Sequence, residues 1–297
     1  MKRSVTSIAS TKGLQPRGGF LPISQMEVGN LSLDSDYAEK VEKLLKNGNI
    51  SDSLMGQCFD YGVKLEYIDN RDPDDCIKAI KLKMLSTFST ARCGARMIGE
   101  EENCRIALDR LYQAYNTPCT KYDRRKFIPI YAELARYEAI SHSGNPNLKP
   151  MASKATKNEA DALDYMINTT VCSFWDTIII PSSGRSPRFY GKGAKNVEVS
   201  ACDLLFDDAI VELKYSKNEP TPRHTFQLLL YYLMGLHERP EIFKWLWKLI
   251  IINPRIGKFY SIETGLLDKE MLKHIELDIM GYETSVVDHL TVTTIPQ

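Results

Sequence analysis

Two carboxylates and a lysine lie close together in the last third of the chain, in the stretch Asp203-x8-Glu212-Leu213-Lys214. The apolar, β-branched run Ala209–Tyr215 predicts a strand. On a strand, Glu212 and Lys214 point to the same face, because successive side chains alternate. An acid beside a lysine on one face of a sheet is suited to binding a cation and a phosphate group together.

The segment before this strand is expected to pair with it as a hairpin. Val197, Val199 and Ala201 alternate with polar residues, as in a half-buried strand. If the turn is centred on Asp207-Asp208, Asp203 lies directly opposite Glu212, whereas a loop of odd length would shift the register by one. Like charges in that position repel unless water or a cation separates them. Two carboxylates with a substrate phosphate are a suitable ligand set for Mg²⁺.

A helix is expected to follow and to end before Pro240, because Thr221-Pro222 has the form of an N-cap followed by proline at the first helical position. His224, Gln227 and Tyr231 lie at i, i+3 and i+7 and therefore share a stripe. The other side carries apolar residues that should face the sheet: Phe226, Leu229, Leu230 and Leu233. Taken alone, the polar stripe is more typical of an ordinary amphipathic helix than of a functional site.

Together, Asp203, Glu212-Leu213-Lys214 and Gln227-Leu-Leu-Leu-Tyr231 resemble the motifs of the PD-(D/E)XK nuclease superfamily, and within it the RecB-like branch. The resemblance implies an α/β fold with the core order αβββαβ, a mixed sheet flanked by helices. The whole chain also resembles a group of bacterial proteins that place a helical region before such a core. The implied activity is metal-dependent hydrolysis of phosphodiester bonds in DNA. Exonuclease and endonuclease, and DNA and RNA, are all compatible with these motifs.

The resemblance also implies a metal site and a catalytic lysine. Asp203 and Glu212 would hold Mg²⁺ or Mn²⁺, with the Leu213 carbonyl as a further ligand, and Lys214 would orient or deprotonate the attacking water. Gln227 and Tyr231 would position the phosphate backbone or the lysine. An upstream helix often adds one more ligand, for which Glu159 is a weaker candidate and Asp161 and Asp164 are alternatives.

Two other cofactors are not expected. Iron–sulfur members of the RecB-like branch place cysteines beyond the Gln-x-x-x-Tyr helix, and this chain has none after Cys202. The chain also has no GxxxxGK[ST] sequence, so neither a bound nucleotide nor a fused helicase motor is expected.

A basic loop over residues 181–196 is a weaker candidate for nucleic-acid contact. It holds Arg185, Arg188, Lys192 and Lys195 and no acid, with Phe189 and Tyr190 between them. Such a loop could contact phosphates and stack on bases, or it could simply be a soluble connector. His224 is a further weak candidate, although a histidine in this position is more often a capping or surface residue.

Composition places this site in a soluble protein of one large or two ordinary domains. The 297 residues carry 38 Lys+Arg and 38 Asp+Glu, which argues against coating nucleic acid through bulk positive charge. No apolar run approaches the length of a membrane span. We expect a flexible basic tail over residues 1–30, a helical region over 31–145, and a nuclease-like domain over 146–297 that begins after the turn-rich Ser143–Asn147. A cytoplasmic location is expected.

The elements that must position the site can be predicted from periodicity. Helices are expected at Asp36–Leu45, at Leu54–Ile68, after Asp72-Pro73, at 101–116, at 122–141 and at Asn158–Phe174. Strands are expected at Thr177–Ile180 and in a hairpin formed by Lys248–Ile252 and Phe259–Ile262. One alternative function is a nuclease fold that binds DNA or protein without cutting. Another is a scaffold whose helical region forms a homo-oligomer or binds a partner protein.

Overall fold

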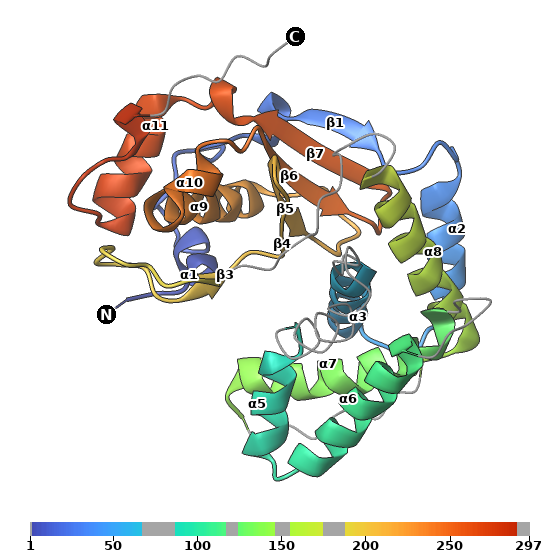
Figure 1. Ribbon diagram of the computed structural model, residues 1–297. Coiled ribbons are helices and arrows are strands. Elements are labelled where there is room, and N and C mark those ends of the chain that lie inside the picture. The colour runs from blue at the N-terminus through green and yellow to red at the C-terminus, as the bar shows by residue number, and fades with distance from the viewer. Residues whose placement is uncertain (1, 67–86, 117–123, 146–154, 175–187, 290–297) are drawn as a thin grey trace. The chain divides into compact units, whose positions relative to one another are not determined.

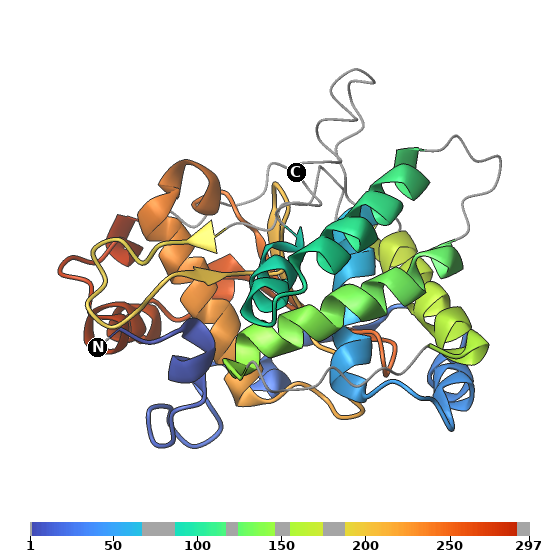
Figure 2. The same cartoon turned by 90° about the horizontal axis from the view of Figure 1, so that it is seen from below.

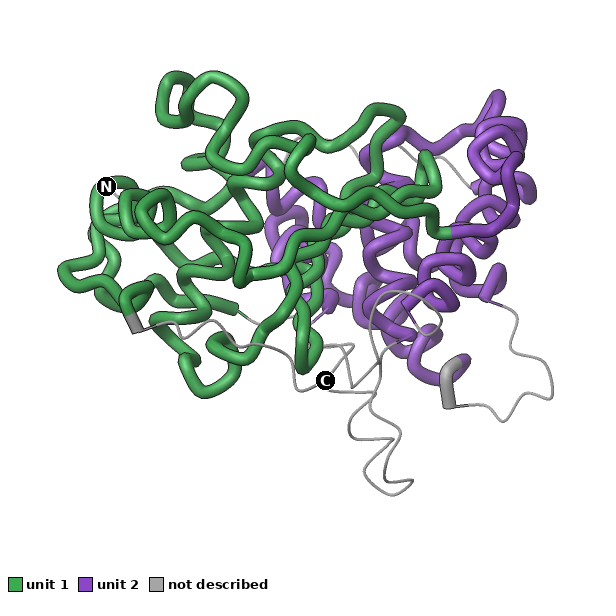
Figure 3. Tube along the Cα trace, turned by 90° about the horizontal axis from the view of Figure 1, so that it is seen from above, with its two compact units in different colours: residues 1–31, 178–297 green, residues 32–177 purple. Residues whose placement is uncertain are grey.

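The chain forms two compact units in the computed structural model, which describes residues 2–66, 87–116, 124–145, 155–174 and 188–289. Unit 1 contains residues 1–31 and 178–297, and unit 2 contains residues 32–177 (Figure 3). Unit 1 is therefore built from two stretches of chain that the whole of unit 2 separates in sequence. The helix expected after Asp72-Pro73, the strand expected at Thr177–Ile180, and Arg185 lie outside the described residues.

The described part of unit 2 is helical, as the periodicity of its sequence predicts. Its helices are α2 (Tyr37–Leu45), α3 (Asp52–Glu66), α5 (Ser89–Met97), α6 (Glu101–Asn116), α7 (Ile128–Ser143) and α8 (Lys157–Ser173). Of these, α5 is not predicted from the sequence. Helices α5 and α7 pack at very close range, because a Cβ added at Gly94 would lie 1.7 Å from the backbone oxygen of Tyr137.

Unit 1 is built on a mixed five-stranded sheet, which confirms the α/β class (Figure 1). The strand order is β1 (Glu27–Asn30), β7 (Lys258–Glu263), β6 (Lys248–Asn253), β5 (Ala209–Leu213) and β4 (Leu204–Leu205). Strands β5 and β6 are parallel, and the other neighbours are antiparallel. Between β5 and β6 the chain forms α9 (Pro222–Glu238) and the short α10 (Pro240–Phe243), as parallel neighbours require a crossover connection.

The predicted hairpin register before β5 is confirmed. Leu204 pairs with Val211 and Leu205 with Ile210, so the turn is centred on Asp207-Asp208. The strand expected from Val197 is shorter than predicted: only Ser200–Ala201 forms β3, which pairs with β2 (Arg188–Phe189). Val197 instead makes an isolated parallel bridge with Arg3. The β6–β7 hairpin and the helix ending before Pro240 are also as predicted.

The first 31 residues differ from the flexible tail expected from their basic composition. They contain α1 (Val5–Ala9), a 3-10 turn at Ile23–Gln25, and β1, which forms the edge of the sheet beside β7. The physical reason is burial, since Val5 and Ile8 are fully buried in the core that also contains the apolar side chains of α9. The boundary expected near Ser143–Asn147 differs as well, because α8 belongs to unit 2.

The end of unit 1 folds against the far end of α9. Helix α11 (Lys269–His274) continues into a π-helical turn at Ile275–Met280. His237 of α9 stacks on Tyr282 with ring centroids 3.5 Å apart, and its Nε2 lies 2.6 Å from the buried Glu276 Oε1. Among the helices of the described residues, none combines the length and the apolar character that a membrane-spanning segment needs.

Candidate active site

Strand β5 ends at Leu213, and not at Tyr215 as predicted, so it carries Glu212 of the site while Lys214 follows its last residue. All five of its residues are buried, and it lies inside the sheet between β4 and β6. Ile210 of this strand belongs to the core formed with α9. Glu212 and Lys214 lie two and four residues further along the extended chain, so they are on the same face as Ile210, toward α9. Glu212 is only 3% exposed. A buried carboxylate is costly unless it is paired, and the Lys214 ammonium meets this need at 2.5 Å from Glu212 Oε1.

The charge of Lys214 is stabilised by its two acidic neighbours. Burial disfavours the ammonium form, but the carboxylates of Glu212 and Asp203 outweigh it and the pKa of Lys214 is raised. Lys214 is therefore a cation and a hydrogen-bond donor at neutral pH. About a fifth of its side chain is exposed to solvent.

Asp203 immediately precedes β4, where extension of the hairpin register by one pair places it across from Glu212. Its Oδ2 accepts a hydrogen bond of 2.8 Å from the backbone N–H of Leu213. The carboxylate thus joins the two strands just beyond their last ladder pair. The sequence-predicted neighbours Asp203, Glu212, Leu213 and Lys214 are brought together in the structure.

Gln227 and Tyr231 of α9 complete this cluster. Gln227 Oε1 accepts a hydrogen bond of 3.2 Å from Lys214 Nζ, and its Nε2 donates one of 3.1 Å to the Tyr231 hydroxyl. Gln227 is 6% exposed and Tyr231 is 4% exposed, so this stripe is not an ordinary solvated helix face. Burial, followed by the charge of Glu212, raises the pKa of Tyr231 well above its usual value, which keeps the hydroxyl protonated.

His224 lies in the first turn of α9 and serves as a cap. Its Nδ1 accepts a hydrogen bond of 3.1 Å from the backbone N–H of Thr221. Burial, with the positive charges of Lys214 and Arg223, lowers the pKa of His224 to about 4. The imidazole is neutral at pH 7, so it offers no fixed charge to a phosphate.

The basic loop is described from Arg188 onward. Arg188, Lys192 and Lys195 are exposed, and Lys195 lies 3.6 Å from Glu283 in a pair that is itself exposed. Phe189 is fully buried and packs edge-on against Phe243, with ring centroids 5.5 Å apart. It is therefore a core residue and not a platform for a base.

Glu159 belongs to unit 2 and is engaged there. Its side chain forms a capping box with Thr156 at the start of α8, where Glu159 Oε2 accepts a hydrogen bond of 2.7 Å from the Thr156 N–H. The other oxygen accepts one of 2.7 Å from the Ile50 N–H. The two alternatives are also paired in unit 2: Asp161 with Arg125 and Asp164 with Arg124.

Two residues that support the site are not predicted from the sequence. Asn253, at the end of β6, is fully buried, and its side chain accepts a hydrogen bond of 3.3 Å from the Ser216 N–H and donates one of 2.9 Å to the Asn218 carbonyl. It holds the turn that follows Lys214. An asparagine that ends an apolar strand could have signalled this. The second residue is Thr6, whose Oγ1 accepts a hydrogen bond of 3.4 Å from Gln227 Nε2. The sequence around Thr6 does not indicate this contact.

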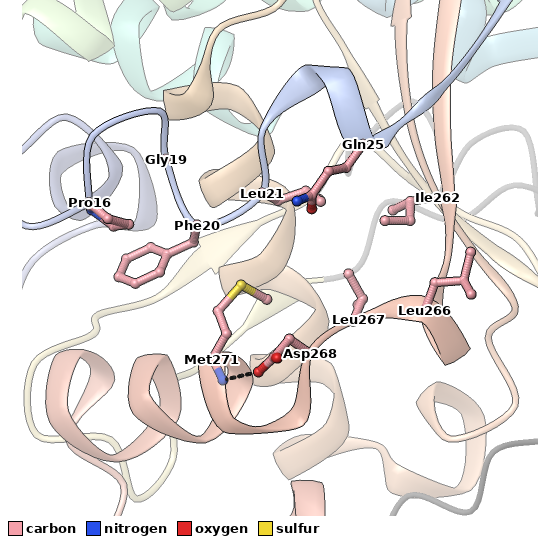
Figure 4. A pocket seen from close by; sticks show the side chains of 10 residues that line it. All are labelled: Pro16, Gly19, Phe20, Leu21, Gln25, Ile262, Leu266, Leu267, Asp268 and Met271. Carbon is pink, nitrogen blue, oxygen red and sulfur yellow. Dashed lines mark hydrogen bonds between the residues drawn. The ribbon is translucent and has the colours of Figure 1, made fainter.

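A cavity of about 740 Å³ lies elsewhere in unit 1 (Figure 4). It is lined mainly by apolar side chains from the N-terminal segment, β7 and α11, including Phe20, Leu21, Ile262 and Met271. The carboxylate of Asp268 caps α11 by accepting a hydrogen bond of 2.7 Å from the Met271 N–H. None of the predicted site residues lines this cavity.

Among the described residues, no group of three or more His, Cys, Asp or Glu side chains is placed to hold a metal ion. Any ion at the site would therefore depend on the two carboxylates, Asp203 and Glu212, together with backbone, water or substrate oxygens. Comparisons of the chain with protein-family models, with curated proteins and with solved structures find no match.

Proposed function

We propose that unit 1 is a metal-dependent nuclease of the PD-(D/E)XK type and the RecB-like branch, which hydrolyses phosphodiester bonds in DNA. The observation that carries the proposal is the position of the Lys214 ammonium, between Glu212 and Gln227. The succession β5, α9 and β6, with parallel strands, is compatible with the strand–helix–strand end of such a core.

The donor atoms suit Mg²⁺ or Mn²⁺. Asp203, Glu212 and the Leu213 carbonyl would offer only oxygen, and hard divalent ions prefer oxygen ligands and retain several waters. Two carboxylates are sufficient where the substrate phosphate supplies further oxygens. When bound, the ion would polarise the scissile phosphate and lower the pKa of a coordinated water.

The residues of the chain itself would orient the reacting groups. Because the pKa of Lys214 is raised, its ammonium would act as a donor to the attacking water or to a phosphate oxygen. It would also balance the negative charge that develops on the phosphorus oxygens. Gln227 would keep the ammonium aimed into the site, and the Tyr231 hydroxyl would hold Gln227.

The test is a cleavage assay on linear, circular and single-stranded DNA with Mg²⁺, Mn²⁺ or EDTA. We expect metal-dependent cutting that Lys214→Ala abolishes. Lys258→Ala is the matched control, because it removes a lysine of the same unit that is also ion-paired, at 3.2 Å from Glu219. Cleavage by Lys214→Ala at the wild-type rate would refute the assignment. The circular substrate reports whether a DNA end is required.

A non-catalytic module is the second candidate. It is favoured by the direct Lys214–Glu212 ion pair, in which one carboxylate already has a cationic partner. Such a protein would bind DNA or a partner protein through the same face without hydrolysis. Binding of DNA by the wild-type protein, with no nicking in Mn²⁺, would support this candidate over the nuclease.

A further inference from the structure

The segment before α1 is hydrogen-bonded to residues 196–200, which precede Asp203 in the chain. The Arg3 N–H donates a hydrogen bond of 2.8 Å to the Asn196 carbonyl, and the Arg3 carbonyl accepts one of 3.0 Å from Glu198. The Val5 N–H then donates one of 3.2 Å to the hydroxyl of Ser200, three residues before Asp203. These hydrogen bonds hold residues 3–5 beside the segment that supplies Asp203 to the candidate site.

Helix α1, which follows this segment, packs on α9, the helix that carries Gln227 and Tyr231. Helix α1 lies beside α9 (Figure 2), and Val5 and Ile8 are fully buried in the core that they share. Thr225 in the first turns of α9 also donates a hydrogen bond of 2.7 Å to the Leu21 carbonyl. The N-terminal segment therefore contacts both chain elements that supply site residues.

At this junction, Thr6 meets the side chain of Gln227. The Gln227 amide has two N–H donors, of which one meets the Tyr231 hydroxyl at 3.1 Å and the other meets Thr6 Oγ1 at 3.4 Å. An ammonium can only donate, so Lys214 requires that the amide oxygen face it. With the oxygen so directed, both N–H groups need acceptors, and Thr6 supplies the second.

We propose that Thr6 is a positioning residue of the active site, which acts on Lys214 through Gln227. This inference rests on the proposed function for its effect on cleavage but not for its effect on structure. Loss of the threonine hydroxyl removes the acceptor of this part-buried N–H group, and an amide on a side chain that is only 6% exposed has little access to water in its place, which is unfavourable. The amide then turns to find another partner, and its oxygen leaves the Lys214 ammonium.

Three variants test the role of Thr6. Thr6→Val removes the hydroxyl and keeps the shape of the side chain, and Thr6→Ser restores the hydroxyl. Thr11→Val is the matched control, because Thr11 belongs to the same segment but its hydroxyl accepts from Arg3 at 3.1 Å and not from Gln227. Thr6 is exposed, so these changes leave the core of α1 intact.

The direct measurement is the NMR signal of the Gln227 side-chain amide, assigned by its absence in Gln227→Leu. We expect Thr6→Val to shift this signal, with Thr6→Ser and Thr11→Val close to wild type. In the cleavage assay we expect kcat to fall about 10-fold in Thr6→Val with KM nearly unchanged, because a small displacement of a catalytic group is costly.

The two measurements separate this inference from the proposed function. An unchanged Gln227 amide signal in Thr6→Val overturns the positioning role, whatever the cleavage rate. A shifted signal with a wild-type kcat overturns it too, because Lys214 would then act independently of Thr6. If the wild-type protein does not cut DNA at all, the nuclease proposal fails, and the amide signal with its rescue by serine still decides whether Thr6 holds Gln227.

Discussion

Asp203 accepts a hydrogen bond of 2.8 Å from the backbone N–H of Leu213, so this carboxylate joins the residue before β4 to the end of β5. Under the proposed function, the same carboxylate would also bind the metal ion. The two roles call for different chemistry. An acceptor oxygen is enough to hold the backbone N–H, whereas a divalent cation is bound better by a charged carboxylate.

Asp203→Asn should therefore separate the two roles. We expect this variant to keep a melting temperature close to wild type and to lose Mn²⁺ binding and cleavage. Asp203→Ala should also lose Mn²⁺ binding and cleavage. In addition, its free energy of unfolding should fall by about 1 kcal/mol, because the Leu213 N–H loses its acceptor. Isothermal titration with Mn²⁺ and thermal unfolding measure the two effects. Equal Mn²⁺ affinity in Asp203→Asn and wild type would exclude Asp203 as a ligand.

The Glu212–Lys214 pair should show strong coupling in a double-mutant cycle. Breaking a buried ion pair from one side leaves an uncompensated charge, which costs about 3–5 kcal/mol when burial is complete. We expect Lys214→Met to be more destabilising than Glu212→Gln, because 4% of the Glu212 side chain is exposed against 21% for Lys214. In urea unfolding, the double variant should be about 1–3 kcal/mol more stable than the sum of the two single-variant losses predicts.

The exposed pair Lys195–Glu283 is the control for this cycle. Its side chains are 71% and 77% exposed, so its coupling energy should lie near zero and at most about 1 kcal/mol. Similar coupling in the two pairs would show that the Glu212–Lys214 contact is not a desolvated interaction.

His224 should make the protein less stable in mild acid. Its pKa is lowered to about 4 in the folded protein by burial, Lys214 and Arg223, whereas an unperturbed histidine titrates near 6.5. Between these values the unfolded chain binds the extra proton and the folded chain does not, so stability falls as pH decreases from about 6.5 to about 4.

His224→Gln isolates this contribution of the histidine. A glutamine three residues after Thr221 can accept from the Thr221 N–H in a standard capping box, and it does not titrate. We expect this variant to match wild type at pH 7 and to exceed its free energy of unfolding at pH 5. Parallel stability curves for the two proteins over this range would contradict the effect.

In unit 2, Gly94→Ala should be destabilising, although alanine usually stabilises a helix relative to glycine by about 1 kcal/mol. The new Cβ would lie 1.7 Å from the backbone oxygen of Tyr137, and backbone cannot move aside as a side chain can. We expect a loss of about 1–3 kcal/mol in denaturant unfolding from this overpacking. Arg96→Ala, at an exposed position of the same helix, is the control and should change stability little.

Where local rules apply, the sequence is sufficient to predict how the residues of the candidate site are placed relative to one another. The turn at Asp207-Asp208 has an even loop, so simple alternation places Asp203 across from Glu212, and the pairing of Leu204 with Val211 confirms the register. The stripe of Gln227 and Tyr231 follows from helical spacing in the same way. The burial of that stripe was not predictable, because it depends on Thr6 and α1, which lie about two hundred residues away in the chain.

Strand β1 shows the same limit. Its four residues, Glu27 to Asn30, lack apolar alternation, and three of the four are exposed. They form a strand because β7 offers them its free edge, with Val28 paired to Tyr260. A partner so distant in sequence leaves no periodic signal in the segment itself, so composition alone favoured a basic tail.

The discontinuity of unit 1 has a consequence for the order of events on the ribosome. The α1 and β1 segments are synthesised before unit 2, but their partners α9 and β7 emerge only after all of unit 2. Unit 2 is continuous in sequence and its described part is helical, so it can fold while synthesis continues. The α1 and β1 segments can pack only after α9 and β7 have been synthesised, and this packing closes a very long loop. The entropic cost of closing a loop grows only slowly with its length. Completion of the candidate active site is thus tied to synthesis of the segments that follow unit 2.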